Sequence, residues 1–425
     1  MRHLFVKCLL ATLVAVLSSI CALPSLPAPL PSMAGSLTLE GGMPILRLQG
    51  SPYEMGAQHG ILLRQPLRQI VQDYLYDGFF RGSPTAHADL LAWGRNLDRR
   101  LPQGIRRELA GIADGAGLAY FDVLLLNALP DYVCLTDRLP GSSTAASMAA
   151  VPDGCGFVSA AFAAWGSSTY GGELIVGYCA NQERDVSSGR PWVLALRKPT
   201  HGNASVSLSA IGSVGVWLGV TENALIAALL RSPSVDVAAD GPPLTVVLRQ
   251  ALEGSDNLEA LVGEVIGSAR SSGGNLVMGD ATAPEALSIE MSAHRHALFR
   301  YLETEQFVTC ADYFVDSELA VTRQDGGGTL GRAGNETRQW GLRMALQLNH
   351  GWIGKAKALQ FVGEYGAGSR AMALGLNGRE ESTCLLQGIL LSRDQITLMW
   401  AAGCTAANPD GCTSLELGTL FAGTR

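Results

Sequence analysis

The spacing of apolar residues predicts two helices in the first third of the chain. After a strand-like run at residues 45–48, apolar side chains recur with helical spacing from Leu62 to Tyr74. Pro52 suits the first helical turn, and Glu54 lies where the helix dipole favours an anion, so we expect this helix to begin near Pro52. A second helix is predicted over residues 101–118, where a glycine-rich end suits a C-cap.

The second half of the chain combines strand and helix patterns. Alternation typical of strands occurs at residues 205–211, 214–219, 273–280, 385–391, 395–401 and 415–420. Two amphipathic helices are predicted between them, at residues 244–252 and 257–266. Clusters of strands with helices between them predict an α+β fold.

Residues 153–182 read as a β-hairpin that carries a candidate nucleophile. An apolar run ends at Trp165-Gly166, a Gly-rich turn follows, and a second apolar run returns to Gly177. Cys155 stands at the start of the first strand, and a deprotonated Cys is a good nucleophile. If the Gly154–Cys155 bond were cut, the new α-amine, with a pKa near 8, would act as a local base. The alternative is an ordinary core hairpin with a buried Cys.

Composition and charge restrict the class of protein. The 425 residues are 47% hydrophobic and 16% charged, which suits a compact globular chain. A net charge of −7 with scattered basic residues argues against a nucleic-acid partner. The histidines are also scattered, so we expect no metal and no other cofactor.

The first residues resemble a targeting signal. Arg2 and Lys7 flank the start of an apolar run at residues 8–16, and small residues precede a cleavage site after Ala22. No later stretch is apolar enough for a stable membrane span. We therefore expect a signal peptide at 1–22, a linker rich in Pro, Leu and Ser at 23–42, and a protein that is secreted, periplasmic or in a lysosome-like lumen.

Export makes disulfides possible. Seven cysteines remain after the signal peptide, and an odd number leaves at least one thiol unpaired. Cys404 and Cys412 flank a Pro-Asp-Gly turn and are the pair most readily bridged.

Several motifs together resemble one enzyme family. They are the Gly-Cys before the hairpin, its Trp165-Gly166, the Gly50-Ser-Pro-Tyr-Glu-Met-Gly56 segment and the Asn275 strand. This pattern resembles N-terminal nucleophile (Ntn) hydrolases, in the branch of acyl-CoA:6-aminopenicillanic acid acyltransferases and phospholipase-B-like relatives. The resemblance implies a four-layer αββα sandwich. It also implies a propeptide-like segment at 43–154 that forms one compact domain with a catalytic-like segment at 155–425.

The resemblance leaves the nucleophile open. Counted forward from Asp153-Gly154 it is Cys155, and counted back from Phe162 and Trp165 it is Ser159. A third alternative is that the chain has no nucleophile. The resemblance makes Asn275 an oxyanion donor and Asn181 a residue that orients the nucleophile's amine. Glu54 and His59 resemble a catalytic pair, but one Glu and one His at a helix start are common, and we expect them to be structural.

Other positions depart from the family pattern. Tyr178 replaces an Arg, Thr221 replaces an Asn, and the His of a Thr-Asn-His-Phe motif is missing. Cys179 and Cys310 fall where the family has polar pocket residues. We hypothesise that these two cysteines form a disulfide across the pocket.

The sequence is compatible with two functions. One is an exported, autoprocessed amidohydrolase or acyltransferase that acts on a small acylated substrate through a Cys nucleophile. The other is a catalytically inactive homologue that serves as a ligand-binding or structural scaffold. The sequence leaves the acyl group, the acceptor and the oligomeric state open.

Overall fold

The structure is a computed structural model of the chain. It describes residues 34–136, 157–182, 191–232, 234–300, 304–323, 331–367, 384–391, 396–400, 413–417 and 421. All of these lie in one compact unit, Ala34–Arg425. The expected signal peptide, the Gly154–Cys155 bond and the Cys404–Cys412 pair lie outside the described residues.

A nine-stranded sheet, called the large sheet below, forms one half of the sandwich. In spatial order its strands are β1(Ser36–Glu40), β2(Met43–Gly50), β5(Trp192–Pro199), β6(Ser205–Ala210), β7(Leu218–Thr221), β8(Leu225–Arg231), β9(Gly274–Asp280), β10(Glu285–Met291) and β11(His296–Phe299). Strands β2 and β5 are parallel neighbours, whereas the other neighbouring pairs of described strands are antiparallel. The N-terminal segment therefore supplies two strands of the sheet that the rest of the chain completes.

A six-stranded sheet, called the small sheet, contains the predicted hairpin. Its order is β12(Phe307–Ala311), β3(Phe157–Ala164), β4(Ile175–Gln182), β13(Cys384–Leu391), β14(Thr397–Trp400) and β15(Thr413–Glu416), with every neighbouring pair antiparallel. The hairpin prediction is confirmed: β3 and β4 pair along their full length, and a 3₁₀ turn, η2(Gly166–Ser168), follows β3.

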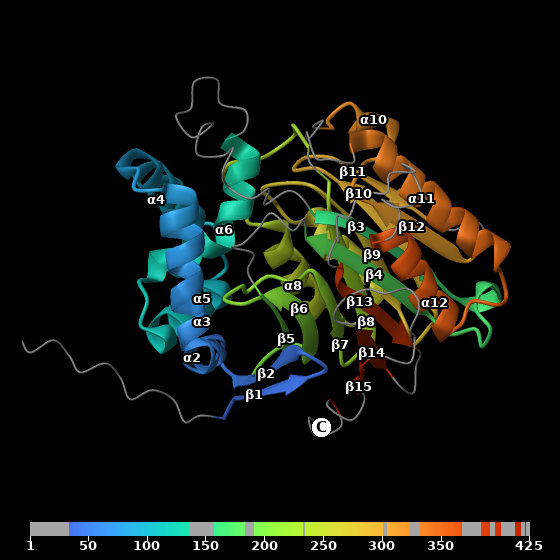
Figure 1. Cartoon of the computed structure of the whole chain (residues 1–425), viewed down its shortest axis with the longest axis horizontal. Coiled ribbons are helices and arrows are strands. Elements are labelled where there is room, and N and C mark those ends of the chain that lie inside the picture. Colours follow the sequence, from blue (N-terminus) through green and yellow to red (C-terminus); the bar gives the residue numbers. More distant parts are fainter. Residues whose placement is uncertain are drawn as a thin grey trace, which may run out of the picture. The chain divides into compact units, whose positions relative to one another are not determined.

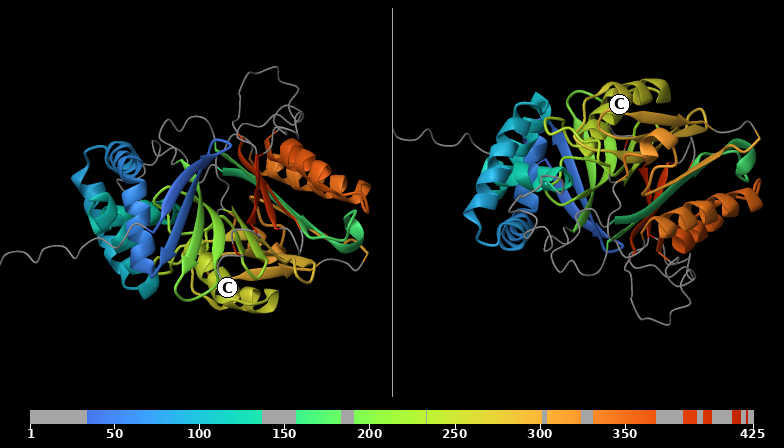
Figure 2. Two further views of the ribbon diagram at one scale, coloured as in Figure 1. Left: turned by 90° about the horizontal axis from the view of Figure 1, so that it is seen from below. Right: turned by 90° about the horizontal axis from the view of Figure 1, so that it is seen from above.

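The two sheets and their covering helices form four layers (Figure 2). Apolar side chains from both sheets make one core between them. α8(Leu244–Gly254) and α9(Leu258–Gly267) pack on the outer face of the large sheet. α11(Gly331–Leu348), α12(Lys355–Val362) and η3(Gly363–Ala367) cover the outer face of the small sheet. The predicted α+β class is confirmed, and the layer order is helix, sheet, sheet, helix.

The N-terminal helices form a further helical layer with an apolar core of its own (Figure 1). They are α2(Pro52–Leu62), α3(Arg64–Ile70), the π-helix η1(Val71–Phe80), α4(Pro84–Asp98), α5(Gln103–Ala116) and α6(Tyr120–Thr136). Helices α2 and α5 touch through glycines: a Cβ on Gly56 would lie 2.1 Å from the Glu108 carbonyl oxygen, and one on Gly111 would lie 2.2 Å from that of Tyr53. The glycine spacing in this motif is therefore explained by helix packing.

Two boundaries differ from the sequence prediction. The expected linker, 23–42, includes β1, which pairs with β2 through a two-residue Gly41-Gly42 turn. Both glycines have positive φ, 51° and 79°, which suits a tight hairpin connection. The expected strand at 214–219 begins only at Leu218. Preceding it, the Val216 N–H donates to the Thr245 carbonyl of α8 instead of to a strand.

Candidate active site

The backbones of Ser159, Asn181 and Asn275 lie at one end of the sandwich, where β3 begins, β4 and β12 end and β9 begins. Val158 is paired with Asn181 and Ser159 with Ala180, so the backbones of the two hairpin candidates are neighbours. Ala311, the last residue of β12, is paired with Ala160 on the other side of β3. Cys155 lies outside the described residues, two positions before the first residue of β3.

Strand alternation assigns faces to this hairpin. Ala161, Ala163 and Tyr178 contribute to the core between the sheets. Ala160, Phe162 and Cys179 contribute to the core under α11 and α12. The backbone of Ser159 lies at the end of β3 that is closest to Asn275, and the Ser159 assignment stays a prediction.

Asn275 links the two sheets at this end. It is fully buried in β9, opposite Leu230 of β8 and Glu290 of β10. Its Nδ2 donates to the carbonyl oxygens of Ala311 and Tyr313, at 2.6 and 2.7 Å. Its Oδ1 is buried and has no hydrogen-bond partner among the described residues. Since a carboxamide has two N–H donors, both are occupied here, and the remaining group is an acceptor.

Glu290 fixes the same loop of the small sheet beside Asn275. Its carboxylate accepts hydrogen bonds from the N–H groups of Val315, at 2.8 Å, and Asp316, at 2.9 Å. Burial raises the pKa of Glu290, while these backbone donors act in the opposite direction. Asp316 in turn caps α10(Ser317–Ala320). Two buried side chains of the large sheet thereby hold the chain that leaves β12 in place.

The position where the Ntn resemblance implies Arg is occupied by a neutral phenol. Tyr178 is buried between the sheets, and its hydroxyl donates to the Leu229 carbonyl oxygen at 3.4 Å. Burial raises the pKa of Tyr178, and the nearby Asp312 acts in the same direction, so the hydroxyl stays protonated.

On the other face of the small sheet, Arg338 of α11 is also buried. Burial lowers the pKa of Arg338, while Asp312 and Cys179 act in the opposite direction.

The hypothesis of a Cys179–Cys310 disulfide is wrong. Neither residue is in a disulfide, and both are buried. Cys179 is paired with Ala160 and Cys310 with Ala161, so they occupy opposite faces of the small sheet. A disulfide needs Cβ vectors that point toward each other, which opposite faces forbid. Burial raises the pKa of Cys310 well above its usual value, so this thiol stays protonated.

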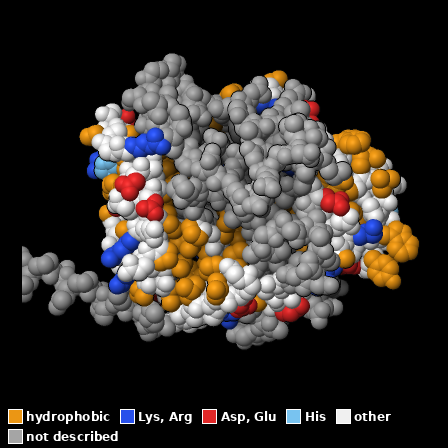
Figure 3. Space-filling view, viewed as in Figure 1, with side chains coloured by type: hydrophobic (Ala, Val, Ile, Leu, Met, Phe, Trp, Pro, Cys, Tyr) orange, Lys and Arg blue, Asp and Glu red, His pale blue; other side chains and the backbone are white. Residues whose placement is uncertain are grey.

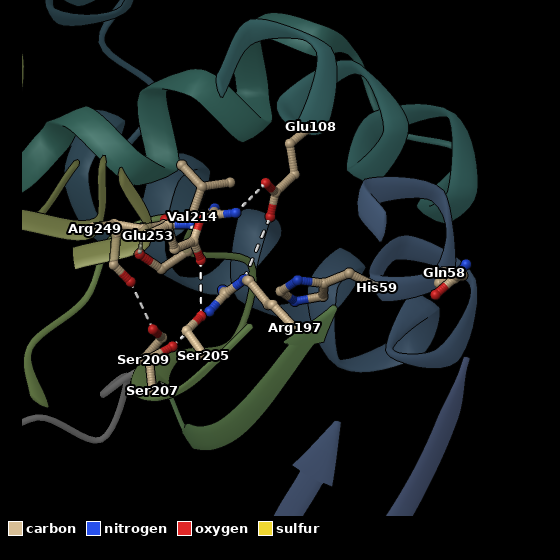
Figure 4. Close-up of polar contacts among 12 residues, drawn as sticks. Gln58, His59, Glu108, Arg197, Ser205, Ser207, Ser209, Val214, Arg249 and Glu253 are labelled. Carbon is tan, nitrogen blue, oxygen red and sulfur yellow. Dashed lines mark hydrogen bonds and ion pairs between the residues drawn. The ribbon is translucent and has the colours of Figure 1, made fainter. Parts of the chain in front are cut away.

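Glu54 and His59 have structural contacts. Glu54 and Ser51 form a reciprocal capping box at the start of α2. His59 (Figure 4) is fully buried. Its Nε2 accepts a hydrogen bond from the Gly212 N–H at 3.0 Å, which connects α2 to the loop after β6. Thr221, the residue in place of a family Asn, accepts the Leu225 N–H at the far end of β8 from Asn275.

A second polar cluster was not found by sequence reasoning (Figure 4). Glu108 of α5 forms an ion pair with Arg249 of α8 at 2.7 Å and lies 3.7 Å from Arg197 of β5. Arg249 also pairs with Glu253 at 3.1 Å. Burial lowers the pKa of Arg197 to about 10, and Arg249 adds to that effect. Burial alone would lower the pKa of Arg249, but Glu108 and Glu253 raise it.

This four-charge cluster joins the N-terminal helices to the large sheet. Arg197 Nη1 also donates to Ser207 Oγ, and Ser205 Oγ donates to Glu253 at 2.8 Å. Two carboxylates face two guanidinium groups, so the cluster is balanced in charge. Two features of the sequence belong to this cluster: Glu108 within an amphipathic helix, and the Ser-x-Ser-x-Ser pattern of β6. By themselves they indicate only exposed polar positions.

The last turns of α6 are anchored near the candidate site. Asp131 accepts hydrogen bonds from Ser271 at 2.6 Å and from Ser272 at 2.8 Å. Arg231, at the end of β8, donates to the Pro130 carbonyl oxygen at 3.1 Å. The chain that leads from α6 toward the Gly154–Cys155 bond therefore starts from the same end of the large sheet as Asn275.

Two features are absent from the part of the chain that the structure describes. Within the described ranges, no three His, Cys, Asp or Glu side chains are grouped as metal ligands. No helix of the described part of the chain has both the length and the apolar character of a membrane span. The expectation that the protein needs no metal or cofactor stays a prediction.

Comparisons with known proteins give distant likenesses. No family model matches the chain. An uncharacterised protein from Archaeoglobus fulgidus is 29% identical over 285 residues, which cover 62% of this chain and 46% of the relative. The match thus spans about half the length of that relative.

Two solved structures show a weak similarity to this chain. The Caenorhabditis elegans N-acylethanolamine-hydrolyzing acid amidase ortholog has a TM-score of 0.37 and 12% identity, covering 54% of this chain and 92% of that one. A mutant of conjugated bile acid hydrolase from Clostridium perfringens has a TM-score of 0.41 and 12% identity, covering 61% of this chain and 93% of that one. Values of this size do not assign the chain to a family.

Proposed function

We propose that the chain hydrolyses or transfers an acyl group at an amide bond, through a nucleophile at the start of β3. The observation that carries this proposal is the buried Asn275 at the end of the sandwich where β3 begins, whose Oδ1 has no hydrogen-bond partner in the part of the chain that the structure describes. A buried polar atom without a partner costs free energy, so a native site usually has a use for it. The α+β architecture and the motifs around the hairpin agree with the Ntn resemblance.

The proposed nucleophile is the Cys155 thiol, with Ser159 as the alternative. Attack on the Gly154 carbonyl carbon would transfer the acyl group from nitrogen to sulfur and free the α-amine. Water would then cleave the thioester, leaving Gly154 as a carboxylate and Cys155 as a new N-terminus. In the catalytic cycle the α-amine takes the thiol proton, and the thiolate attacks the carbonyl carbon of the substrate amide. The C–N bond breaks, the leaving amine takes the proton back from the ammonium, and the acyl group stays on sulfur as a thioester. Water, or an acceptor in a transfer reaction, then cleaves the thioester and regenerates the thiol.

We propose that Asn275 acts as an acceptor rather than as the expected oxyanion donor. To donate, it would have to give up its bond to the carbonyl of Ala311 or Tyr313. Its Oδ1 is instead suited to an N–H of the nucleophile's ammonium or of the substrate amide. Backbone N–H groups would then stabilise the oxyanion, and Asn181, across from the start of β3, would orient the amine.

A silent scaffold is the second candidate. The observation that favours it is Tyr178, a neutral, buried phenol where the resemblance calls for a cation. Export, with a secreted, periplasmic or luminal location, belongs to both candidates and rests on the N-terminal pattern alone. The substrate would be a small acylated molecule.

A denaturing gel separates the two candidates. Under the first, purified wild type gives fragments 23–154 and 155–425, while Cys155→Ala gives a single band. Ser159→Ala and the buried-thiol control Cys310→Ala should both be cleaved. If Ser159→Ala alone blocks cleavage, the nucleophile is Ser159. A wild-type protein that stays in one piece, and whose Cys155 still reacts with a thiol label when a competing substrate is present, supports the scaffold.

A further inference from the structure

Large hydrophobic side chains are exposed on the helical layer over the small sheet and on the adjoining β3–β4 turn. Trp340 and Leu348 lie about two helical turns apart on α11 and are 65% and 78% exposed. Trp352, just after that helix, is 68% exposed, and Tyr170, in the β3–β4 turn, is 77% exposed. Figure 3 shows orange side chains gathered along the right-hand rim, where Figure 1 draws the end of α11 and this turn. We call these four residues the aromatic rim.

The end of the rim is rigidly built. The Tyr170 N–H donates to the Ile353 carbonyl at 3.0 Å, and the Gly351 N–H donates to the Ser168 carbonyl at 2.9 Å. These bonds join the β3–β4 turn to the loop after α11. The Tyr170 and Trp352 rings lie 6.4 Å apart, each still largely in solvent. Two aromatic rings are therefore held outward by a braced support, which lowers the entropy lost when they dock.

The α11–α12 side of the rim is basic, whereas the β3–β4 turn carries Glu173, three residues after Tyr170. Residues 337–363 contain no Asp or Glu, although the whole chain has 38 acidic residues against 31 basic ones. Lys355 is exposed and Lys357 is half-buried at the start of α12, beside Trp352. Arg343, between Trp340 and Leu348, is paired with Glu305 at 2.6 Å. The two lysines thus leave a local positive charge on an otherwise acidic protein.

We propose that the aromatic rim binds the surface of a bilayer that contains anionic lipid. Trp and Tyr are favoured at the membrane–water boundary, because their rings combine an apolar body with a polar group. Lysines beside them would lie at the level of anionic headgroups. The rim would bring a protein without a described membrane span to a surface where acylated substrates are concentrated. This binding is independent of the proposed hydrolase activity.

Vesicle sedimentation of the full chain tests the proposal. Wild type should bind phosphatidylcholine vesicles that contain phosphatidylglycerol, and bind them less as salt rises. A Tyr170→Gln/Trp352→Gln variant should lose roughly tenfold or more of its partition coefficient. Leu39→Gln is the matched control, because Leu39 is 71% exposed on β1, away from the rim. Lys355→Gln should weaken binding to anionic vesicles, whereas Lys198→Gln on β5 should not.

Three results would overturn the proposal. Wild type that fails to bind anionic vesicles ends it, as does a rim variant that binds as well as Leu39→Gln. Concentration-dependent dimers of wild type that disappear in Trp352→Gln, with no lipid binding, would make the rim an interface between copies. Circular dichroism checks that each variant is folded, and Trp340→Gln provides a second rim variant if the double variant is not.

Discussion

The candidate site and the four-charge cluster are both buried and polar, but they are satisfied in different ways. In the cluster, Glu108 has two cationic neighbours, and the carboxylates equal the guanidinium groups in number. At the site, Asn275 uses both donors on backbone carbonyls and keeps a buried acceptor without a partner among the described residues. The cluster also keeps buried atoms without a hydrogen-bond partner among the described residues, namely Glu108 Oε1 and Arg197 Nε and Nη2. Its charges nevertheless compensate one another across two layers, so we interpret it as a connection between layers. Asn275 is neutral and lies at the end of the sandwich where β3 begins, so it is the better candidate for chemistry.

The cluster should respond most strongly to the loss of one partner. Glu108→Gln would leave Arg197 and Arg249 buried with one carboxylate between them, and we expect a loss of about 3–5 kcal/mol in unfolding free energy. Urea unfolding measures it. The exposed Glu259→Gln on α9 serves as the control and should stay within about 0.5 kcal/mol of wild type. A Glu108→Gln protein as stable as this control would show that the cluster does not fasten the layers.

Asn275 should affect both stability and activity. Asn275→Leu leaves the Ala311 and Tyr313 carbonyls without this donor, and we expect a loss of roughly 2–4 kcal/mol, at about 1–2 kcal/mol for each of the two carbonyl groups. Urea unfolding and self-cleavage are measured on the same preparation. Unlike Glu108→Gln, a folded Asn275→Leu protein should also be cleaved more slowly. Cleavage at the wild-type rate would place Asn275 among the structural residues.

Glu290, which lies beside Asn275, should make the stability of the protein depend on pH. Its pKa is raised in the folded state by burial, so deprotonation costs more in the folded than in the unfolded chain. Its contribution to stability is thus fullest below the unfolded value of about 4.3 and falls as pH rises through the folded pKa. The difference in unfolding free energy between wild type and Glu290→Gln, measured by urea unfolding across this pH window, should therefore decrease as pH rises. A difference that increases with pH would contradict the raised pKa.

Tyr178→Phe should have the smallest effect. The variant loses only a long hydrogen bond, 3.4 Å from hydroxyl to carbonyl oxygen, and keeps the buried ring. We expect a loss of about 0.5–1 kcal/mol and unchanged self-cleavage. Slower cleavage at equal stability would instead show that the phenol takes part in the chemistry.

Local patterns predicted the elements well, because local physics fixes them. Pro52 and Glu54 marked the start of α2, and the Gly-rich turn after Trp165 marked the hairpin. The Gly41-Gly42 turn carried an equally clear hairpin signal, but the surrounding Pro and Ser residues suggested a linker.

Relations between elements were harder to predict. The face on which Cys179 or Cys310 lies depends on strand register, and register is set by pairing partners far apart in the sequence. The partners of Glu108 come from β5 and α8, many residues away, so no local pattern reveals them. Likewise, the open acceptor of Asn275 appears only once its two backbone partners, Ala311 and Tyr313, are in place.

Intact mass spectrometry of the purified wild type after alkylation under native conditions tests the central claim most directly. The account predicts a polypeptide that begins at Cys155 and carries one label on that residue, together with a separate fragment that ends at Gly154. A single chain that is continuous through Gly154–Cys155, with Cys155 joined to another cysteine, would contradict it.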